Sequence, residues 1–363
     1  MSTEKEFHPV HPLQFNLNAG VTPISQDIFN LHMAIFLICV VIGFIVFGIL
    51  IYALIYHRKS RKHKPISFHS HTMIEWIWAI IPLIILIIMA IPATLVLIRM
   101  DDESKADLNI KITGHQWKWE YDYPEQGIKF FSNLSTPQAE IDGKEAKKQW
   151  YLLEVDKPLV IPIHKKIRFL VTSNDVIHSW WVPAFGIKRD AIPGYIHEAW
   201  ARVDKPGIYR GQCAELCGMH HAFMPIVVIA KTQADFDLWV AKQTGANKAA
   251  KIATATGPAK VFTKDELMAS GKTVYETTCA VCHKPDGSGM PPAFPALKGG
   301  KITTGTVADH IAIVINGKPG TAMQAFKNQL TNEQIAAVIT YERNTWGNSG
   351  GIVQPEDIAK VKK

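Results

Sequence analysis

Two long apolar runs occur near the start of the chain. Residues 33–56 are uncharged, and residues 76–98 are interrupted only by Pro82 and Pro92. About 20 apolar residues in a helix span the hydrocarbon core of a bilayer, and membrane helices tolerate proline. A buried soluble helix would seldom stay apolar on all sides for this length. The pattern therefore predicts a two-helix transmembrane hairpin within residues 28–100.

Short β-type segments follow the apolar runs. They occupy residues 108–112, 151–155, 166–172, 209–212 and 225–230, with turn residues between them. Short strands separated by turn signals are typical of a β-sandwich or barrel. A β domain is therefore expected over residues 101–240.

The rest of the chain divides into a linker and a helical domain. Residues 241–260 are rich in Ala, Lys, Thr and Gly and have no periodic apolar face, so they are expected to form a flexible linker. Residues 264–278 and 330–346 have helical patterns, and the second begins with the capping residue Thr331. An all-α domain is expected over residues 261–363.

The positive charge is concentrated in two segments. Of a net charge of +7, residues 57–73 contribute five Lys/Arg and no acid, and residues 241–260 contribute four lysines and no acid. The folded parts are close to neutral, which argues against nucleic-acid binding. The positive-inside bias places the basic loop 57–73 in the cytoplasm and both termini outside. Residues 1–27 lack the pattern of a cleavable signal and are expected to be an extended outer arm.

One loop concentrates soft metal ligands. Cys213, Cys217, His221 and Met224 fall within twelve residues, a set suited to copper or iron–sulfur and poorly suited to magnesium or calcium. Two cysteines could bridge two metal ions, each of which would need its own imidazole, so a second histidine must come from elsewhere. The alternative is a disulfide between the two cysteines, which explains nothing else in the loop.

The helical domain carries a separate motif. Cys279-Ala-Val-Cys282-His283 is the c-type haem attachment pattern, in which both cysteines form thioethers and His283 is the proximal iron ligand. A redox dithiol or half a zinc site are the alternatives. Met323, in a Gly/Pro-rich segment, is the preferred sixth ligand, and Met290 is the competitor. A Met/His pair gives a raised potential.

The copper motif resembles that of cytochrome c oxidase subunit 2. The family pattern Cys-x-Glu-x-Cys-x-x-x-His-x-x-Met is complete here, and Asp175-Val-Ile-His178-Ser-Trp resembles the family's upstream histidine segment. The resemblance implies a cupredoxin-like Greek-key barrel with a binuclear copper A centre. Its implied ligands are the bridging Cys213 and Cys217, the capping His178 and His221, and the weak axial Met224 sulfur and Glu215 carbonyl.

The same resemblance implies roles for three further residues. Glu215 would also bind an interfacial magnesium ion, Trp117 would be the point where electrons enter from cytochrome c, and Glu75 would line the mouth of a proton channel. Simpler interpretations are a solvated Glu215, a Trp117 that packs in a strand, and an interfacial Glu75 with no task. Lys118 departs from the tyrosine that relatives carry after the tryptophan.

As a whole, the chain resembles subunit 2 of a caa3-type oxidase, in which a class I cytochrome c domain is fused to the copper subunit. The implied path runs from a cytochrome c or cytochrome bc1-type donor to haem c, to copper A, and to haem a of subunit 1. That subunit, with haem a3 and copper B, reduces oxygen coupled to proton translocation, and subunit 3 is a further partner. A bacterial inner membrane is the implied location. Alternatives are a copper A subunit of a nitric oxide reductase and a free-standing membrane-anchored carrier; a quinol oxidase subunit would lack the copper ligands.

Overall fold

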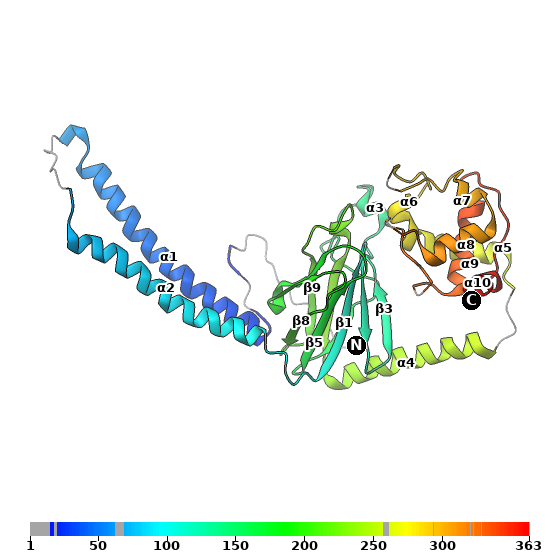
Figure 1. The fold of residues 1–363 in the computed structure, drawn as a ribbon, viewed down its shortest axis with the longest axis horizontal. Coiled ribbons are helices and arrows are strands. Elements are labelled where there is room, and N and C mark those ends of the chain that lie inside the picture. Colours follow the sequence, from blue (N-terminus) through cyan, green and yellow to red (C-terminus); the bar gives the residue numbers. More distant parts are fainter. Residues whose placement is uncertain are drawn as a thin grey trace.

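The computed structural model describes residues 15–17, 20–61, 69–256, 261–292, 294–319, 321, 323–327 and 329–362. Most of the expected N-terminal arm, Lys62 and Lys64 of the basic loop, and the last four linker residues lie outside this part of the chain. The described residues form a helical hairpin, a β-sandwich and a helical domain that follow one another along the long axis of the molecule (Figure 1).

The hairpin consists of α1 (Pro23–Tyr56), the 3-10 turn η1 (Lys59–Arg61) and α2 (Thr72–Met100). Both long helices have the length and apolar composition of membrane spans, and neither apolar window is buried within the protein. The side chains of Thr22 and Ser25 form a capping box at the start of α1. This cap stabilises the first turn of the helix, so α1 begins at Pro23. The N-terminal arm therefore ends before the expected residue 27. Thr22 also donates a hydrogen bond to the Phe185 carbonyl, which ties the hairpin to the sandwich.

The sandwich contains two five-stranded sheets, which confirms the prediction of a β-sandwich or barrel. One has the order β3-β2-β1-β5-β8 and the other β4-β10-β9-β6-β7. The strands of the first sheet are β1 (Leu108–His115), β2 (Lys118–Tyr123), β3 (Ile128–Ser132), β5 (Lys166–Ser173) and β8 (His197–Arg202). Those of the second are β4 (Leu159–Pro162), β6 (His178–Val182), β7 (Ile187–Ala191), β9 (Gly207–Cys213) and β10 (Pro225–Lys231).

Large aromatic side chains fill the space between the sheets. The fully buried ones are Trp119, Tyr121, Tyr123, Phe169, Trp180 and Tyr209. Each sheet has one parallel pair, β1 with β5 and β4 with β10, among antiparallel ones. The domain is the cupredoxin-like half-barrel that the family resemblance implies. Short helical turns, α3 (Gln138–Ile141), η2 (Pro183–Phe185) and η3 (His221–Phe223), lie in the connections.

One predicted strand is wrong. Residues 151–155 form turns, with a single bridge between Val155 and Leu134. Leu152 has a positive φ of 58°, which breaks an extended strand, and the Leu153 N–H bonds locally to the Trp150 carbonyl. Glu154 forms an ion pair with Arg210 of β9, so this segment contributes side chains to the sandwich rather than a strand.

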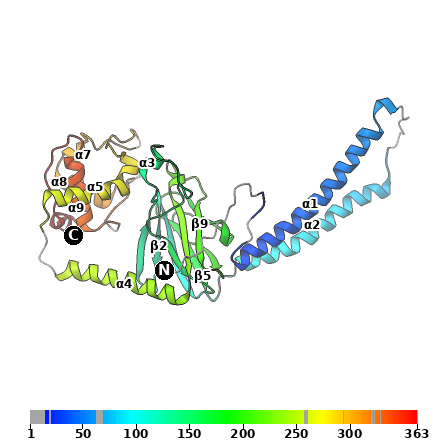
Figure 2. The same ribbon diagram turned by 180° about the vertical axis from the view of Figure 1, so that it is seen from behind.

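The expected flexible linker is mostly a helix. The helix α4 (Gln233–Thr256) includes residues 241–256. Ala, Lys and Gln have high helix propensity, so the segment is helical without an amphipathic face. The Trp239 ring packs against Tyr123 and Phe130 and fixes the start of α4 to the sandwich. From there α4 runs towards the helical domain, as both views show (Figure 2).

The C-terminal domain is all helical. It contains α5 (Lys264–Val274), the π-helical turn η4 (Tyr275–Cys279), α6 (Ala280–His283), α7 (Lys301–Thr304), α8 (Val307–Asn316), α9 (Asn332–Asn344) and α10 (Pro355–Val361). The capping box of Thr331 and Gln334 starts α9, close to the expected position. A Cβ atom on Gly271 would lie 2.1 Å from the Ala337 carbonyl oxygen, so α5 and α9 cross in backbone contact.

Candidate metal centres

Adjacent strands bring the soft ligands of the first centre together. Cys213 ends β9, and its Cα partner on β6 is Trp180, two residues after His178. The loop after Cys213 then returns through η3 to Met224, directly before β10. The strand pairing therefore places His178 beside the loop, as the barrel architecture implied.

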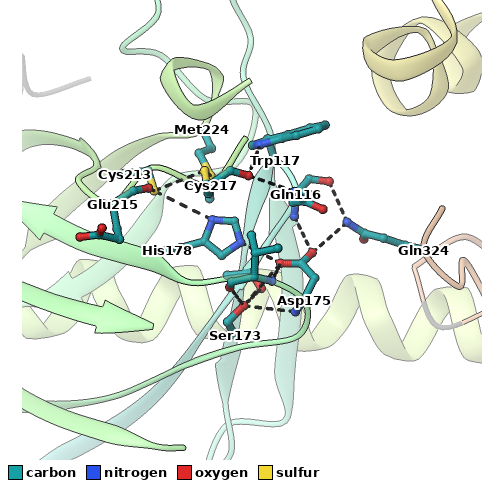
Figure 3. A network of polar contacts seen from close by, with 12 residues as sticks. Gln116, Trp117, Ser173, Asp175, His178, Cys213, Glu215, Cys217, Met224 and Gln324 are labelled. Carbon is teal, nitrogen blue, oxygen red and sulfur yellow. Dashed lines mark hydrogen bonds and ion pairs between the residues drawn. The ribbon is translucent and has the colours of Figure 1, made fainter. Parts of the chain in front are cut away.

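Each of the two sulfur atoms faces one imidazole nitrogen, and Figure 3 shows the contact between Cys213 and His178. The Sγ atoms of Cys213 and Cys217 are 3.8 Å apart, far beyond the roughly 2.05 Å of a disulfide. His178 Nδ1 lies 3.9 Å from Cys213 Sγ, and His221 Nδ1 lies 3.4 Å from Cys217 Sγ. Met224 Sδ is 3.6 Å from Cys217 Sγ. The donor set is thus a pair of sulfurs with a separate imidazole for each, which fits a two-metal cluster bridged by both thiolates.

The two thiols are hydrogen-bonded to each other, and this bond shifts their pKa values in opposite directions. The bond from Cys217 lowers the pKa of Cys213, against the opposing effect of burial. The same bond, followed by burial, raises the pKa of Cys217. A cation bound between the sulfurs would favour loss of both thiol protons.

Asp175 orients the histidine of this centre. Its Oδ1 atom lies 2.8 Å from His178 Nε2, while its two oxygens accept the backbone N–H groups of Gln116 and Val176 at 2.7 Å each. Burial lowers the pKa of His178, but the hydrogen bonds to Asp175 and Cys213 raise it more. With Nε2 held by Asp175, Nδ1 is the nitrogen directed at sulfur. The sequence analysis included Asp175 in the histidine motif but did not predict that it orients His178. Its position three residues before His178 could have indicated this role.

Glu215 faces the sulfur pair with its backbone carbonyl rather than with its side chain. Its carbonyl oxygen lies 3.4 Å from Cys213 Sγ. The carboxylate points away from the sulfurs (Figure 3). Glu75, in the first turn of α2, is exposed and accepts the His71 N–H at 3.2 Å.

Trp117 covers the sulfur loop, which we define as residues 213–224. It lies in the turn between β1 and β2, is 8 % exposed, and donates its indole N–H to the Cys217 carbonyl at 3.1 Å. Its ring meets His220 at 4.9 Å and Phe294 of the helical domain at 6.4 Å between centroids. Trp117 therefore stands between the sulfur loop and the helical domain rather than in a strand.

The second centre is a cavity of about 980 Å³ at the face of the helical domain that meets the sandwich. Cys279, Cys282, His283 and Met323 all line it. Met290 is not among its described lining residues; it pairs with Phe294 in a β-bridge and packs against the sandwich core. The structure thus gives Met323, rather than its competitor, a place on the cavity wall.

The ligands in this cavity fit a covalent haem. His283 Nδ1 lies 2.9 Å from the Pro295 carbonyl, which leaves Nε2 for an iron ligand. Burial raises the pKa of Cys282 to about 11, and burial also raises the pKa of Cys279. A redox dithiol needs a lowered thiol pKa, so this environment disfavours that alternative. Within the described residues, the one group of His, Cys, Asp and Glu side chains close enough to share a metal is at the other centre, which disfavours zinc here.

Three family models match successive parts of the chain. Residues 10–96 match the transmembrane domain of cytochrome c oxidase subunit II, and residues 108–231 match its periplasmic domain. Residues 266–341 match a family described as cytochrome c oxidase, cbb3-type, subunit III. The matches follow the hairpin, the sandwich and the helical domain in order.

Individual proteins agree with these matches. A probable cytochrome c oxidase subunit 2 from Rickettsia bellii is 38 % identical over 232 residues, which cover 64 % of this chain and 85 % of that protein. Cytochrome c oxidase subunit 2 from Arabidopsis thaliana is 40 % identical over 240 residues, or 64 % of this chain and 90 % of that protein. A crystal structure of the periplasmic domain of subunit II of cytochrome oxidase from Bradyrhizobium japonicum is 44 % identical, with a TM-score of 0.35, and covers 39 % of this chain and 96 % of that one.

Proposed function

The chain belongs to the cytochrome c oxidase subunit II family and carries a C-terminal cytochrome c domain, and from this premise we propose that it accepts electrons for a haem–copper terminal oxidase. It would receive them from an external donor at the helical domain and deliver them through the sandwich to the oxygen-reducing subunit 1. The observation that carries the proposal is the pair of free thiols 3.8 Å apart, each with its own facing imidazole nitrogen.

The proposed ligands divide between the two centres. Copper A would be held by Cys213, Cys217, His178, His221, Met224 and the Glu215 carbonyl. Haem c would be held by thioethers at Cys279 and Cys282 and by axial His283 and Met323. When bound, these groups would supply two one-electron carriers in series, and ligand sets that leave no open position suit electron transfer rather than bond making.

Neighbouring residues hold the proposed copper ligands in place. Asp175 holds the His178 ring in one orientation, which limits rearrangement of the ligand. Trp117 and Gln116 both donate to the Cys217 carbonyl, at 3.1 and 3.0 Å, and fix the loop on the side of the helical domain. Trp117 would therefore be the point where electrons enter the copper domain, here from the chain's own cytochrome domain.

The remaining proposed roles depend on partner subunits. The two apolar helices would anchor the chain in a bacterial inner membrane beside subunit 1, with subunit 3 in the same complex and the folded domains on the outer side. Glu215 would add a magnesium ligand at the interface with subunit 1, because its carboxylate points away from the sulfurs. Glu75, exposed near the start of α2, would lie at the mouth of a proton channel, since proton translocation accompanies oxygen reduction in this proposal.

Metal and haem analysis of the purified protein tests the proposal. We expect two copper ions and one covalent haem per chain, a near-infrared band that disappears in Cys217→Ser, and co-purification of a large haem-bearing integral subunit. Cys39→Ser is the matched control, since Cys39 lies on α1 and outside both centres. A disulfide between Cys213 and Cys217 in the metal-replete complex would contradict the copper assignment, and purification without an integral haem subunit would contradict the oxidase.

A further inference from the structure

The haem cavity is completed by the copper domain. Gln116 and Lys118, which lie at and just after the turn between β1 and β2, line the same cavity as Cys279, Cys282 and Met323. The two domains therefore share a wall at the place where the two centres approach each other. The contacts across this wall are specific side-chain hydrogen bonds.

The first contact joins the surroundings of both metal centres. The Gln324 side-chain amide donates to the Gln116 carbonyl at 2.7 Å and to Asp175 Oδ2 at 3.2 Å. Gln324 follows Met323 directly in the chain, and Asp175 holds His178. Met323, the proposed haem ligand, is thus connected through its neighbour Gln324 and the Asp175 carboxylate to His178, the proposed copper ligand. Figure 3 shows the two hydrogen bonds of this connection.

The second contact satisfies a buried cation. Lys118 is 9 % exposed and donates to Gln329 Oε1 of the helical domain. Its ammonium lies 5.4 Å from the centroid of Phe326, also in the helical domain. Burial lowers the pKa of Lys118 to about 8, so it remains mostly charged at neutral pH and needs an acceptor. Gln329 supplies that acceptor only while the domains are seated together.

The two glutamines act as one unit. Gln329 Nε2 donates to Gln324 Oε1 at 3.2 Å and to the Ala325 carbonyl at 2.9 Å. Each glutamine therefore uses its amide and its carbonyl in the network. An amide held at both ends is oriented, so the geometry of the two contacts is fixed together.

We propose that Gln324 and Gln329 are positioning residues that seat the cytochrome domain on the copper domain, with Lys118 and Asp175 as their receptors. The inference rests on the proposed function, because seating has a purpose only if both centres are loaded. If the cytochrome domain is seated in this way, electrons pass from haem to copper in the seated arrangement. The cytochrome domain also occupies the surface of the copper domain beside Trp117.

Three variants test the seat in the complete, loaded complex. Gln324→Leu and Gln329→Leu keep the approximate volume and remove the hydrogen bonds, while Gln324→Glu brings a carboxylate against Asp175. Loss of one net hydrogen bond is expected to reduce the ratio of seated to unseated complex about 2-fold to 13-fold. We expect the largest loss for Gln324→Glu, because like charges repel. Gln243→Leu on α4, outside the cavity lining, is the matched control.

Two measurements separate seating from cofactor loss. Hydrogen exchange of the backbone amides of residues 116–118 should accelerate in the three variants, and electron transfer from haem to copper after flash reduction should slow by a similar factor. Copper content, haem content and both absorption spectra should stay as in the unmodified protein. If exchange and transfer both match the Gln243→Leu control while the cofactors are present, the seat is wrong and the proposed function stands. Missing copper or haem in the unmodified protein would instead remove the proposed function.

Discussion

The two centres of this protein are built in opposite ways. The sulfur and nitrogen donors of the copper centre lie within 4 Å of their nearest neighbours before any metal is considered, because two adjacent strands and a short loop position them. The haem residues instead surround a space of about 980 Å³. The sandwich has an aromatic core of its own, and the helical domain combines a buried apolar cluster with the space that haem would fill.

The space that haem would fill lies at the face of the helical domain that meets the sandwich, and residues of both domains line it. The proposed copper ligands Cys213, Cys217 and Met224 instead belong to the buried cluster of the sandwich. Packing around the haem site should therefore depend on its cofactor more than packing around the copper site does.

Removal of the haem attachment should give the largest effect. In the double variant Cys279→Ala/Cys282→Ala, we expect the helical domain to lose most of its fixed tertiary structure, because the cavity on its sandwich-facing side is left without covalent haem. The sandwich should keep its copper absorption. Near-UV circular dichroism together with the copper spectrum would measure both domains in one sample. Retention of a rigid, haem-free helical domain would show that the contrast between the centres is wrong; Cys39→Ala is the control.

Loss of the carboxylate behind His178 should weaken copper binding, in addition to removing one contact of the seat. Asp175→Asn is expected to weaken copper binding about 10-fold to 100-fold, because the imidazole loses its oriented, charge-assisted hydrogen bond. Chelator competition monitored by the copper absorption would measure the change, with haem content as the internal reference. Asp122→Asn on β2, whose carboxylate forms a long ion pair with Lys129, is the matched control. An affinity equal to that of the control would contradict the role of Asp175.

A matched glycine pair tests whether the domains are independently packed. A Cβ atom at Gly211 on β9 would lie 2.0 Å from the Trp181 carbonyl oxygen, and one at Gly271 on α5 would lie 2.1 Å from the Ala337 carbonyl oxygen. Each alanine variant should destabilise its own domain by about 1–3 kcal/mol, because backbone must move. Denaturant unfolding followed separately by the copper and haem spectra would assign each loss. Gly127→Ala tests mainly backbone strain, since its φ is +62° and no atom crowds it.

The local part of both centres is predictable from sequence, because the ligands are close together in the chain. The spacing of Cys213, Cys217, His221 and Met224 in one loop, and of Cys279, Cys282 and His283 at a helix end, restricts the possible geometry. The placement of His178 was available only through the family resemblance, since strand pairing between β6 and β9 brings it to the loop. The haem-domain helices α7, α8 and α10 were not predicted. The helices α7 and α10 have only four and seven residues, whereas the helical spacing of Ile311, Val314 and Ile315 in α8 was an available signal.

The contacts between domains could not be predicted. The bond from Gln324 to Asp175 joins residues 149 positions apart, and neither side chain belongs to a recognisable motif for such a contact. The linker prediction failed for a different reason. It relied on a missing apolar face, but intrinsic propensity alone extends α4 through residue 256. Lys118, noted only as a departure from relatives, proved to lie in the wall of the haem cavity.

The smallest expected effect lies at the end of the sandwich that meets α2. There, burial and then the hydrogen bond to Glu198 raise the pKa of Glu103 from its ordinary 4.5 to about 7, while Arg168 and Arg189 oppose the shift. At the copper end, by contrast, hydrogen bonds from His178 and from the Gln116 and Val176 N–H groups outweigh burial and lower the pKa of Asp175. The same fold thus shifts the pKa values of two acids in opposite directions.

The raised pKa of Glu103 sets the sign of a pH dependence. The folded protein holds a proton that the unfolded chain releases between pH 4.5 and about 7, so this contribution to stability is complete below 4.5 and is lost as the pH rises through 7. The hydrogen bond from Glu103 lowers the pKa of Glu198, so the contribution of Glu198 changes at lower pH. Screening by solvent should keep the Glu103 effect below about 1 kcal/mol. Melting of the copper domain from about pH 5 to pH 8 should show the decline, and Glu103→Gln should flatten it, because the amide cannot ionise. An equal slope in Glu103→Gln and in the exposed control Glu145→Gln would mean that Glu103 is not the titrating group.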